Sequence, residues 1–332
     1  MSKLVSILVP AYNAEKWITQ TIDSALSQSW APKEIIVVDD GSTDRTLEIA
    51  RTFEPRGVRI ATQNNRGAAA ARNRALSLAG GEFIQWLDAD DLLAPDKIAL
   101  QMKAAEGDRT DLTLYTSPHG VFYYRFKKAT FIPNSLWQDL SPVDWLVTSL
   151  SEMLWMNPAA WLVSRAITDR AGPWDERLSL NDDGEYFGRV VAACRIVRFI
   201  PEAKCYYRQS SFGQLSRSRS EKAADSLLLS TVLRVRALLK LEMSTRTKQA
   251  ALALIRTWMP VFYPDKAEAV EQLRALVKEL GGELEPPRFG WRSRALQRLF
   301  GPEKGKRLRT WLRSLRMAAA VKWDEWMWRW GI

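Results

Sequence analysis

The chain is poor in the residues that most metal and nucleophile sites use. Its 332 positions hold one histidine, His119, and two cysteines, Cys194 and Cys205. A single histidine cannot form a histidine metal cage and argues against Ser/His/Asp catalysis. The cysteines have neither metal-ligand nor CxxC spacing, so we expect two reduced thiols. If the protein is an enzyme, carboxylates must carry the chemistry.

Long apolar runs and a secretory signal are also missing. No apolar stretch approaches the roughly 20 residues that cross a bilayer, and the N-terminus lacks the charged and apolar regions of a signal peptide. We therefore expect a cytoplasmic protein. With 46% hydrophobic residues the chain can bury a full core, in one large domain or two ordinary ones.

Acidic residues gather after one apolar segment. Residues 82–87 are expected to form a strand, which three aspartates follow, Asp88, Asp90 and Asp91. Side chains two positions apart in an extended chain point the same way, so Asp88 and Asp90 suit Mg²⁺ or Mn²⁺, whose other ligands come from water and a phosphate. A cap for the helix expected near Pro95 would explain one aspartate and not three.

The first hundred residues alternate apolar strands with helical periods. This order predicts an α/β fold with a mostly parallel, Rossmann-like sheet, flanking helices and a ligand crevice at the carboxyl edge of the strands. The polar clusters all fall at that edge. Strands are expected at residues 5–9, 34–38, 58–61 and 82–87, and helices are expected to begin near Asn13, Ser42 and Gly67.

Four polar blocks resemble the signature blocks of the family 2 glycosyltransferases, in the same order along the chain. They are Val-Pro-Ala-Tyr-Asn at 9–13, Val-Asp-Asp-Gly-Ser-Thr-Asp at 38–44, the segment 67–73, and Leu-Asp-Ala-Asp-Asp at 87–91. The resemblance implies the GT-A fold. It also implies inverting transfer of a sugar from a nucleoside diphosphate sugar to a hydroxyl acceptor, in cell-surface or other glycan assembly.

The resemblance also implies a donor site. Tyr12 can stack on the base, and Asp40 can accept from a uracil-like N–H or a ribose hydroxyl. Arg72 is expected to reach the diphosphate, or to pair with an aspartate, and the two interpretations are compatible. Asp44 is better explained as a loop and helix cap. The residues implied to bind the nucleotide sugar are Pro10, Tyr12, Asp40, Arg72, Asp88 and Asp90.

A divalent cation, Mn²⁺ or Mg²⁺, is the cofactor that the resemblance implies. Asp90 is the expected metal ligand, and Asp88 is expected to meet the ribose or the water shell of the metal. Such a cation offsets the charge that builds on the departing nucleotide.

The general base is expected in residues 180–189, which resemble the family's second acidic block. Position by position this gives Asp183 as the base and Asp182 as the first acid, on the acceptor side. A carboxylate can deprotonate a sugar hydroxyl with modest pKa tuning. The alternative is that both acids only complement the dipole of a helix N-terminus.

Acceptor-side material is expected in residues 107–165, with strands at 112–116 and 121–126. Trp155 and Trp161 are the candidates to stack on the acceptor sugar, although most buried tryptophans are core residues. The expected acceptor is a glycan or a lipid-linked molecule.

The C-terminal region changes character, and we expect a GT-A domain at 1–215 followed by a helical extension at 216–332. From Arg288 onward the chain has twelve Lys and Arg, three Asp and Glu, and six of its fifteen tryptophans. This tail is interpreted either as an amphipathic helix on the anionic cytoplasmic face of a membrane or as a helix packed on the catalytic domain. Nucleic acid is not expected to bind, because the charge does not line a groove.

Two other functions remain as alternatives. A nucleotidyltransferase shares such a sheet and a carboxylate-bound metal, but would favour a glycine-rich and basic loop where residues 10–13 read Pro-Ala-Tyr-Asn. A degenerate transferase could serve as a membrane-surface scaffold, but the aspartates are intact.

Overall fold

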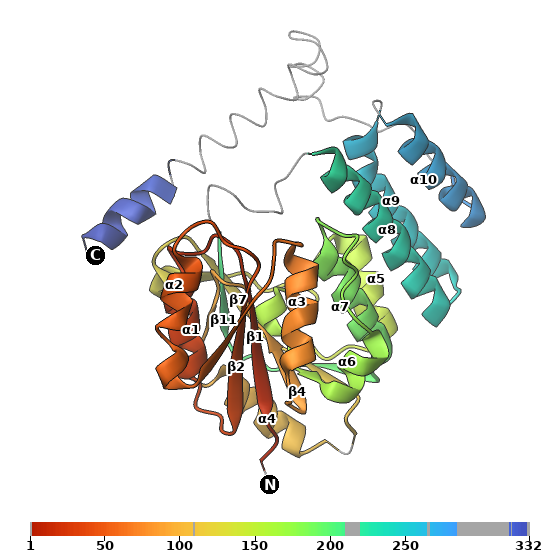
Figure 1. Cartoon of the computed structure of the whole chain (residues 1–332). Helices are drawn as coiled ribbons and strands as arrows, with labels where there is room; N and C mark the ends of the chain where they lie inside the picture. The colour runs from red at the N-terminus through yellow and green to blue at the C-terminus, as the bar shows by residue number, and fades with distance from the viewer. Residues whose placement is uncertain are drawn as a thin grey trace.

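A five-stranded sheet forms the centre of the protein in the computed structural model, which describes residues 2–108, 110–209, 220–263, 266–283, 319 and 321–330. The strand order is β3-β2-β1-β4-β9 (Figure 1). The first four strands are parallel, and β9 pairs antiparallel with β4. Their bounds are Val5–Ala11 for β1, Lys33–Asp39 for β2, Val58–Thr62 for β3, Phe83–Trp86 for β4 and Val163–Ser164 for β9.

The central strands form where the sequence is apolar and β-branched. Ile7, Val9 and Ile36 are fully buried because helices cover both faces of the sheet. Helix α3 packs on β1 and β2, whereas α1 and α2 pack together (Figure 1). The connecting helices are α1 (Ile18–Leu26), α2 (Thr46–Arg51) and α3 (Ala68–Leu78). The predicted alternation of strands and helices is confirmed.

The first helix begins later than the sequence suggests. We expected Asn13 to cap it, but α1 starts at Ile18, and Asn13 has a left-handed backbone with φ 48°. The Asn13 side chain instead accepts a hydrogen bond from the Thr43 N–H at 2.8 Å. A contact between two loops has replaced a local helix cap.

Residues 2–209 are called the catalytic region below, after the role that the sequence predicts for them. Their second half adds two small sheets and four helices within the described residues. The sheets are β5-β11-β7-β8 and β10-β6. The strand expected at 121–126 is only partly right, because β7 ends at Phe122 and a 3-10 turn, η2, occupies Phe126–Lys128. The further bounds are β5 (Leu92–Leu93), α4 (Lys97–Glu106), β6 (Thr113–Thr116), β7 (His119–Phe122), β8 (Thr130–Phe131), α5 (Pro142–Glu152), α6 (Arg165–Ala171), α7 (Asp182–Ala193), β10 (Ile196–Phe199) and β11 (Cys205–Arg208), with 3-10 turns η1 (Glu54–Arg56) and η3 (Pro158–Ala160).

Three further helices follow the catalytic region and share its hydrophobic core. They are α8 (Glu221–Leu241), α9 (Thr245–Phe262) and α10 (Ala267–Glu279). Helix α8 packs against α7, and α9 packs against α5, so their apolar faces continue the main core. The boundary expected at residue 215 lies outside the described residues. In the part of the chain described, no helix is both long and apolar enough to cross a membrane.

A short helix at residues 321–329 is the described part of the basic tail (Figure 1). Val321 is 3% exposed and packs with Trp17 and Tyr124 of the catalytic region. One face of the tail therefore packs on the catalytic region, as one of the two interpretations expected.

Candidate active site

The four polar blocks meet at the carboxyl edge of the sheet. Pro10 lies in β1 beside Val38 of β2. Tyr12 follows the end of β1, and its side chain is 50% exposed. A half-exposed ring at this edge can accept a stacked base, as expected for Tyr12.

Hydrogen bonds lock the first two blocks to each other. The Ser42 hydroxyl accepts from the Asn13 N–H at 3.0 Å. The Asp44 carboxylate accepts from the N–H of Glu15 at 3.1 Å and from the N–H of Thr46, the first residue of α2, at 2.9 Å. Asp44 thus has the loop and capping role that the sequence favoured.

Asp40 is buried and holds the loop that leads into α3. Its Oδ1 accepts from Gln63 Nε2 at 2.7 Å and from the Arg66 N–H at 2.9 Å, and its Oδ2 accepts from the Gly67 N–H at 2.8 Å. These bonds shape the wall beside Tyr12. The neighbouring Asp39 has a buried Oδ1 with no hydrogen-bond partner among the described residues.

Arg72 joins the two acidic blocks. Its side chain is buried and donates to Asp88 Oδ1 at 2.8 Å and to Asp182 Oδ2 at 2.6 Å. The guanidinium lies 4.4 Å from the centre of the Trp174 ring. Burial lowers the pKa of Arg72, but the charges of Asp88 and Asp182 outweigh burial and keep the pKa above its ordinary value. The ion-pair interpretation of Arg72 is confirmed, and its contact with a diphosphate stays a prediction.

The third aspartate of the cluster is structural. Asp91 is fully buried and accepts from Asn157 Nδ2 and from the Arg208 N–H, both at 2.8 Å. Burial, and then the charges of Asp90 and Asp88, raise its pKa well above the ordinary value. Asp91 does not cap the following helix, because α4 begins after Asp96.

Asp90 is the carboxylate that is left for a ligand. Burial and the charge of Asp88 raise the pKa of its carboxyl to about 7, against the lowering effects of Arg208 and of the Asp90 backbone N–H. The described residues contain no group of three or more metal-binding side chains. Asp88 and Asp90 fit a cation that takes its remaining ligands from water and phosphate, because a positive charge would relieve their repulsion.

Asp182 and Asp183 begin helix α7, with different surroundings. Asp182 pairs with Arg72, whereas the described contact of the Asp183 carboxylate is a hydrogen bond from the Gly184 N–H at 2.7 Å. Burial, and then the charge of Asp182, raise the pKa of Asp183 to about 6, against the lowering effect of Arg72. A carboxylate with this pKa can accept a proton near neutral pH.

The two candidate tryptophans separate in the structure. Trp161 is fully buried, stacked on Phe187 at 5.2 Å and edge-on to Trp145, so the expectation that it contacts an acceptor is wrong. Trp155 is 45% exposed. It stacks on His119 at 5.0 Å and lies edge-on to Tyr207 at 5.3 Å.

Sequence reasoning missed two residues of β11. Arg208 is fully buried, and its Nε donates to the Asp90 carbonyl at 2.7 Å. Burial lowers its pKa to about 10. Burial, and then the charges of Asp91 and Asp90, raise the pKa of Tyr207. The segment Cys205–Arg208 carries no motif that could have identified either residue.

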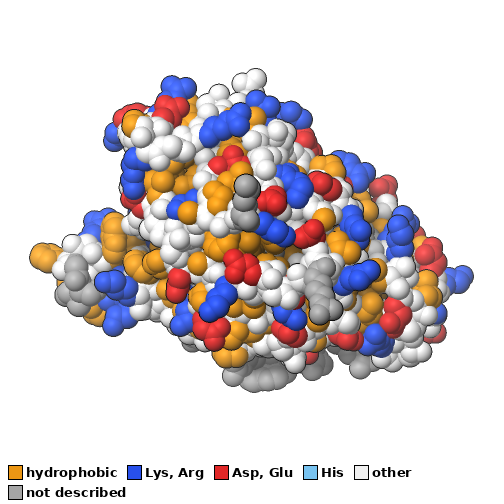
Figure 2. Space-filling view, turned by 90° about the horizontal axis from the view of Figure 1, so that it is seen from below, with side chains coloured by type: hydrophobic (Ala, Val, Ile, Leu, Met, Phe, Trp, Pro, Cys, Tyr) orange, Lys and Arg blue, Asp and Glu red, His pale blue; other side chains and the backbone are white. Residues whose placement is uncertain are grey.

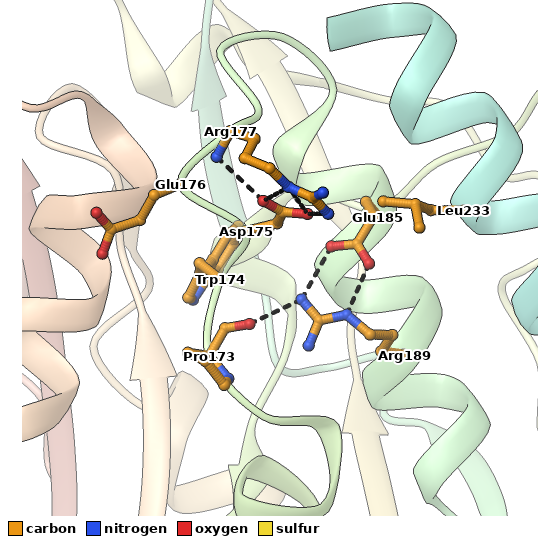
Figure 3. Close-up of a pocket in the computed structure, with 8 residues that line it drawn as sticks. All are labelled: Pro173, Trp174, Asp175, Glu176, Arg177, Glu185, Arg189 and Leu233. Atoms are coloured by element: carbon orange, nitrogen blue, oxygen red, sulfur yellow. Dashed lines mark hydrogen bonds and ion pairs between the residues drawn. The ribbon is translucent and has the colours of Figure 1, made fainter.

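A hollow lined in part by Trp174 lies beside these acids and does not contain them. It has a volume of about 700 Å³. Figure 3 shows that its charged side chains pair with each other: Arg189 with Glu185 at 2.7 Å and Arg177 with Asp175 at 2.6 Å. Trp174 separates the hollow from Arg72. We therefore place the candidate site at the acids and not in this hollow. Its lining residues are Pro173, Trp174, Asp175, Glu176, Arg177, Glu185, Arg189 and Leu233.

The N-terminal part of the chain is similar to a known protein family. Residues 6–135 match glycosyl transferase family 2. This match covers less than half of the chain, in its N-terminal part. A chondroitin synthase of Pasteurella multocida is 43% identical over 121 residues, which cover 36% of this chain and 12% of the synthase. The other curated relatives are also matched over less than half of their own length.

Two solved structures share the fold of this chain. TarS 1–349 of S. aureus in complex with UDP-GlcNAc has a TM-score of 0.63 and 20% identity, over 83% of this chain and 81% of that one. The mannosyltransferase PcManGT of Pyrobaculum calidifontis, in complex with GDP-Man and Mn²⁺, has a TM-score of 0.51 and 18% identity, over 85% of each chain. The GT-A fold expected from the sequence is confirmed, with a helical C-terminal region.

Proposed function

We propose that this protein transfers a sugar, with inversion, from a nucleoside diphosphate sugar to a hydroxyl group of a glycan or lipid-linked acceptor. The observation that carries the proposal is the bridge from Arg72 to Asp88 and Asp182. This bridge joins the donor-side acids to the start of α7, where Asp183 lies with a pKa of about 6. Donor, metal and base positions thus belong to one connected site.

The roles of the residues on the donor side follow from the chemistry of their side chains. Tyr12 stacks on the base, Pro10 and Asp40 shape the nucleoside wall, and Arg72 faces the diphosphate. Asp88 and Asp90 would hold a divalent cation, Mn²⁺ or Mg²⁺, which would offset the charge of the departing nucleotide. The Mn²⁺ in the mannosyltransferase of the same fold supports this choice of cofactor.

The transfer step is a direct displacement. An Asp183 carboxylate oxygen takes the proton of the acceptor hydroxyl while the hydroxyl oxygen of the acceptor forms a bond to the anomeric carbon. The bond from this carbon to the phosphate oxygen breaks, and its electron pair leaves with the nucleoside diphosphate. Because attack and departure occur on opposite faces, the anomeric configuration inverts. Asp182 holds Arg72 in place beside the acceptor side.

The alternatives fit the structure less well. A nucleotidyltransferase needs phosphate-binding groups after the first strand, where this chain has half-exposed Tyr12. A scaffold without activity would have no use for an Asp183 held at a raised pKa, because that pKa costs stability. We further propose that the protein works in the cytoplasm, at the inner face of a membrane.

Thermal stabilisation by UDP, GDP and dTDP, each with and without Mn²⁺, tests the donor assignment. A ligand at a hundredfold excess over its dissociation constant adds about 2.7 kcal/mol of stability, which is visible as a shift in Tm. We expect one nucleotide to stabilise the wild type only with metal, and Asp90→Asn to lose that shift. Glu176→Gln, in the hollow beside the site, is the control and should keep it. No shift with any nucleotide would contradict the proposal.

A further inference from the structure

The tail helix at 321–329 is attached at one defined place. Asp324 Oδ2 accepts from the N–H of Tyr124 at 2.8 Å and of Arg125 at 3.2 Å, and its Oδ1 accepts from Arg125 Nε at 2.7 Å. Burial raises the pKa of Asp324, but these hydrogen bonds outweigh burial and hold the pKa below its ordinary value. Trp328 adds a ring contact to Tyr124 at 5.6 Å. A carboxylate with three donors gives the helix a fixed position.

The attachment point is connected to the donor-side acids. Tyr124 packs edge-on against Trp17 at 5.3 Å, and the Arg208 guanidinium lies 3.9 Å from the centre of the Trp17 ring. Arg208 in turn donates to the Asp90 carbonyl. Figure 1 shows the helix beyond the carboxyl edge of the sheet, on the side of α1 and α2. The helix and the candidate site thus share one edge of the molecule.

The opposite face of the helix is a row of exposed indoles. Trp323, Trp326 and Trp330 are 63%, 49% and 69% exposed. They form a chain, with ring centres 5.5 Å apart in the first pair and 6.3 Å apart in the second. In Figure 2 the helix projects from the left of the molecule with hydrophobic side chains on its surface. Indoles have an apolar body and one N–H, which suits the lipid headgroup region.

The acids of this helix are paired, and the C-terminal sequence is basic. Two of the three acids after residue 287, Asp324 and Glu325, pair with Arg125 and with Lys16 at 3.5 Å. The twelve Lys and Arg of the same stretch outnumber them. A sequence that is rich in Lys and Arg and carries exposed indoles complements a bilayer that contains anionic lipid.

We propose that the helix at 321–329 is a membrane-binding platform. The indole row of Trp323, Trp326 and Trp330 enters the headgroup region of an anionic bilayer, while Asp324 fixes the helix to the catalytic region. The carboxyl edge of the sheet is then held at a set distance from the lipid surface, where a lipid-linked hydroxyl acceptor would lie. The placement of a lipid-linked acceptor rests on the proposed function, whereas the binding of the helix to the membrane does not.

Co-sedimentation of the full chain with vesicles tests this proposal. We expect more binding to phosphatidylcholine vesicles with phosphatidylglycerol than to phosphatidylcholine alone. The triple variant Trp323→Ala/Trp326→Ala/Trp330→Ala should lower the partition coefficient at least about tenfold. Met243→Ala removes a side chain that is 66% exposed, next to the end of α8, and should change nothing. Equal binding by the wild type and the triple variant overturns the proposal.

A second variant separates attachment from lipid contact. Asp324→Asn should keep vesicle binding within about twofold, since the indole row is intact, and should speed hydrogen exchange at the Tyr124 and Arg125 amides. Loss of vesicle binding in this variant would contradict the platform. Sedimentation without lipid shows whether the indole row instead joins two copies of the chain. If the wild type and Asp324→Asn form dimers and the triple variant does not, the proposal is overturned. None of these readouts depends on catalysis, so an inactive protein could still confirm it.

Discussion

Replacing Asp183 by asparagine should abolish transfer and yet stabilise the protein. The structure raises the pKa of this carboxyl from 3.8 to about 6, through burial and the charge of Asp182. Each pKa unit corresponds to about 1.4 kcal/mol, so the ionised carboxylate costs the folded state about 2 kcal/mol after allowance for its partial exposure. Asparagine keeps the shape and can still accept from the Gly184 N–H, but it carries no charge.

The stability difference between Asp183→Asn and the wild type should depend on pH in a definite direction. Because folding raises the pKa of Asp183, its ionisation destabilises the folded state. This cost is absent below about pH 4 and complete above about pH 6. Asp183→Asn should therefore be more stable than the wild type at neutral pH, and the two proteins should converge near pH 4.

Urea unfolding at several pH values, followed by circular dichroism, measures this difference. The matched control is Asp182→Asn, which weakens the bond to Arg72 and should destabilise the protein. If Asp183 only complements the helix dipole, its replacement should instead cost about 0.3–1 kcal/mol at neutral pH. A destabilised Asp183→Asn, or one that retains transfer, would refute the assignment as base.

Arg72→Met should destabilise the protein by about 3 kcal/mol in urea unfolding, because it leaves Asp88 and Asp182 without their shared cation; Arg189→Met, on the far side of Trp174, should leave nucleotide binding intact. Trp161→Ala should cost about 3–5 kcal/mol because its side chain fills the core, whereas Trp155→Ala should cost less than about 1 kcal/mol. The reverse order of these two stabilities would contradict the burial assigned here.

The cluster of polar residues at the carboxyl edge of the sheet was predictable, because it follows from patterns within short segments of the sequence. Apolar β-branched runs alternate with helical periods, and parallel strands place their following loops on one side. The gathering of Tyr12, Asp40, Arg72 and Asp88 follows from this rule. Their individual partners do not, since the bonds of Asp40 to residues 63–67 depend on how two loops meet.

The residues that the sequence did not predict correctly also depend on contacts between distant segments. Trp155 and Trp161 lie in one segment with similar surroundings in sequence, but η3 turns the chain so that only Trp161 enters the core. Arg208 reaches Asp90 through pairing of β11 with β5 and β7, which no local pattern encodes. The sequence offered two alternatives for the tail, a helix packed on the catalytic domain and an exposed amphipathic helix. The structure has a packed face at Val321 and an exposed face at Trp323.

The stereochemistry of donor cleavage tests the proposed mechanism most directly. Once the stabilising nucleotide is known, its sugar diphosphates can be incubated with the protein, and proton NMR can record the anomer of the first sugar transferred or released to water. Direct displacement with Asp183 as base predicts the inverted anomer, and loss of turnover in Asp183→Asn. Retention of configuration, or no cleavage of any sugar ester of that nucleotide, would contradict it.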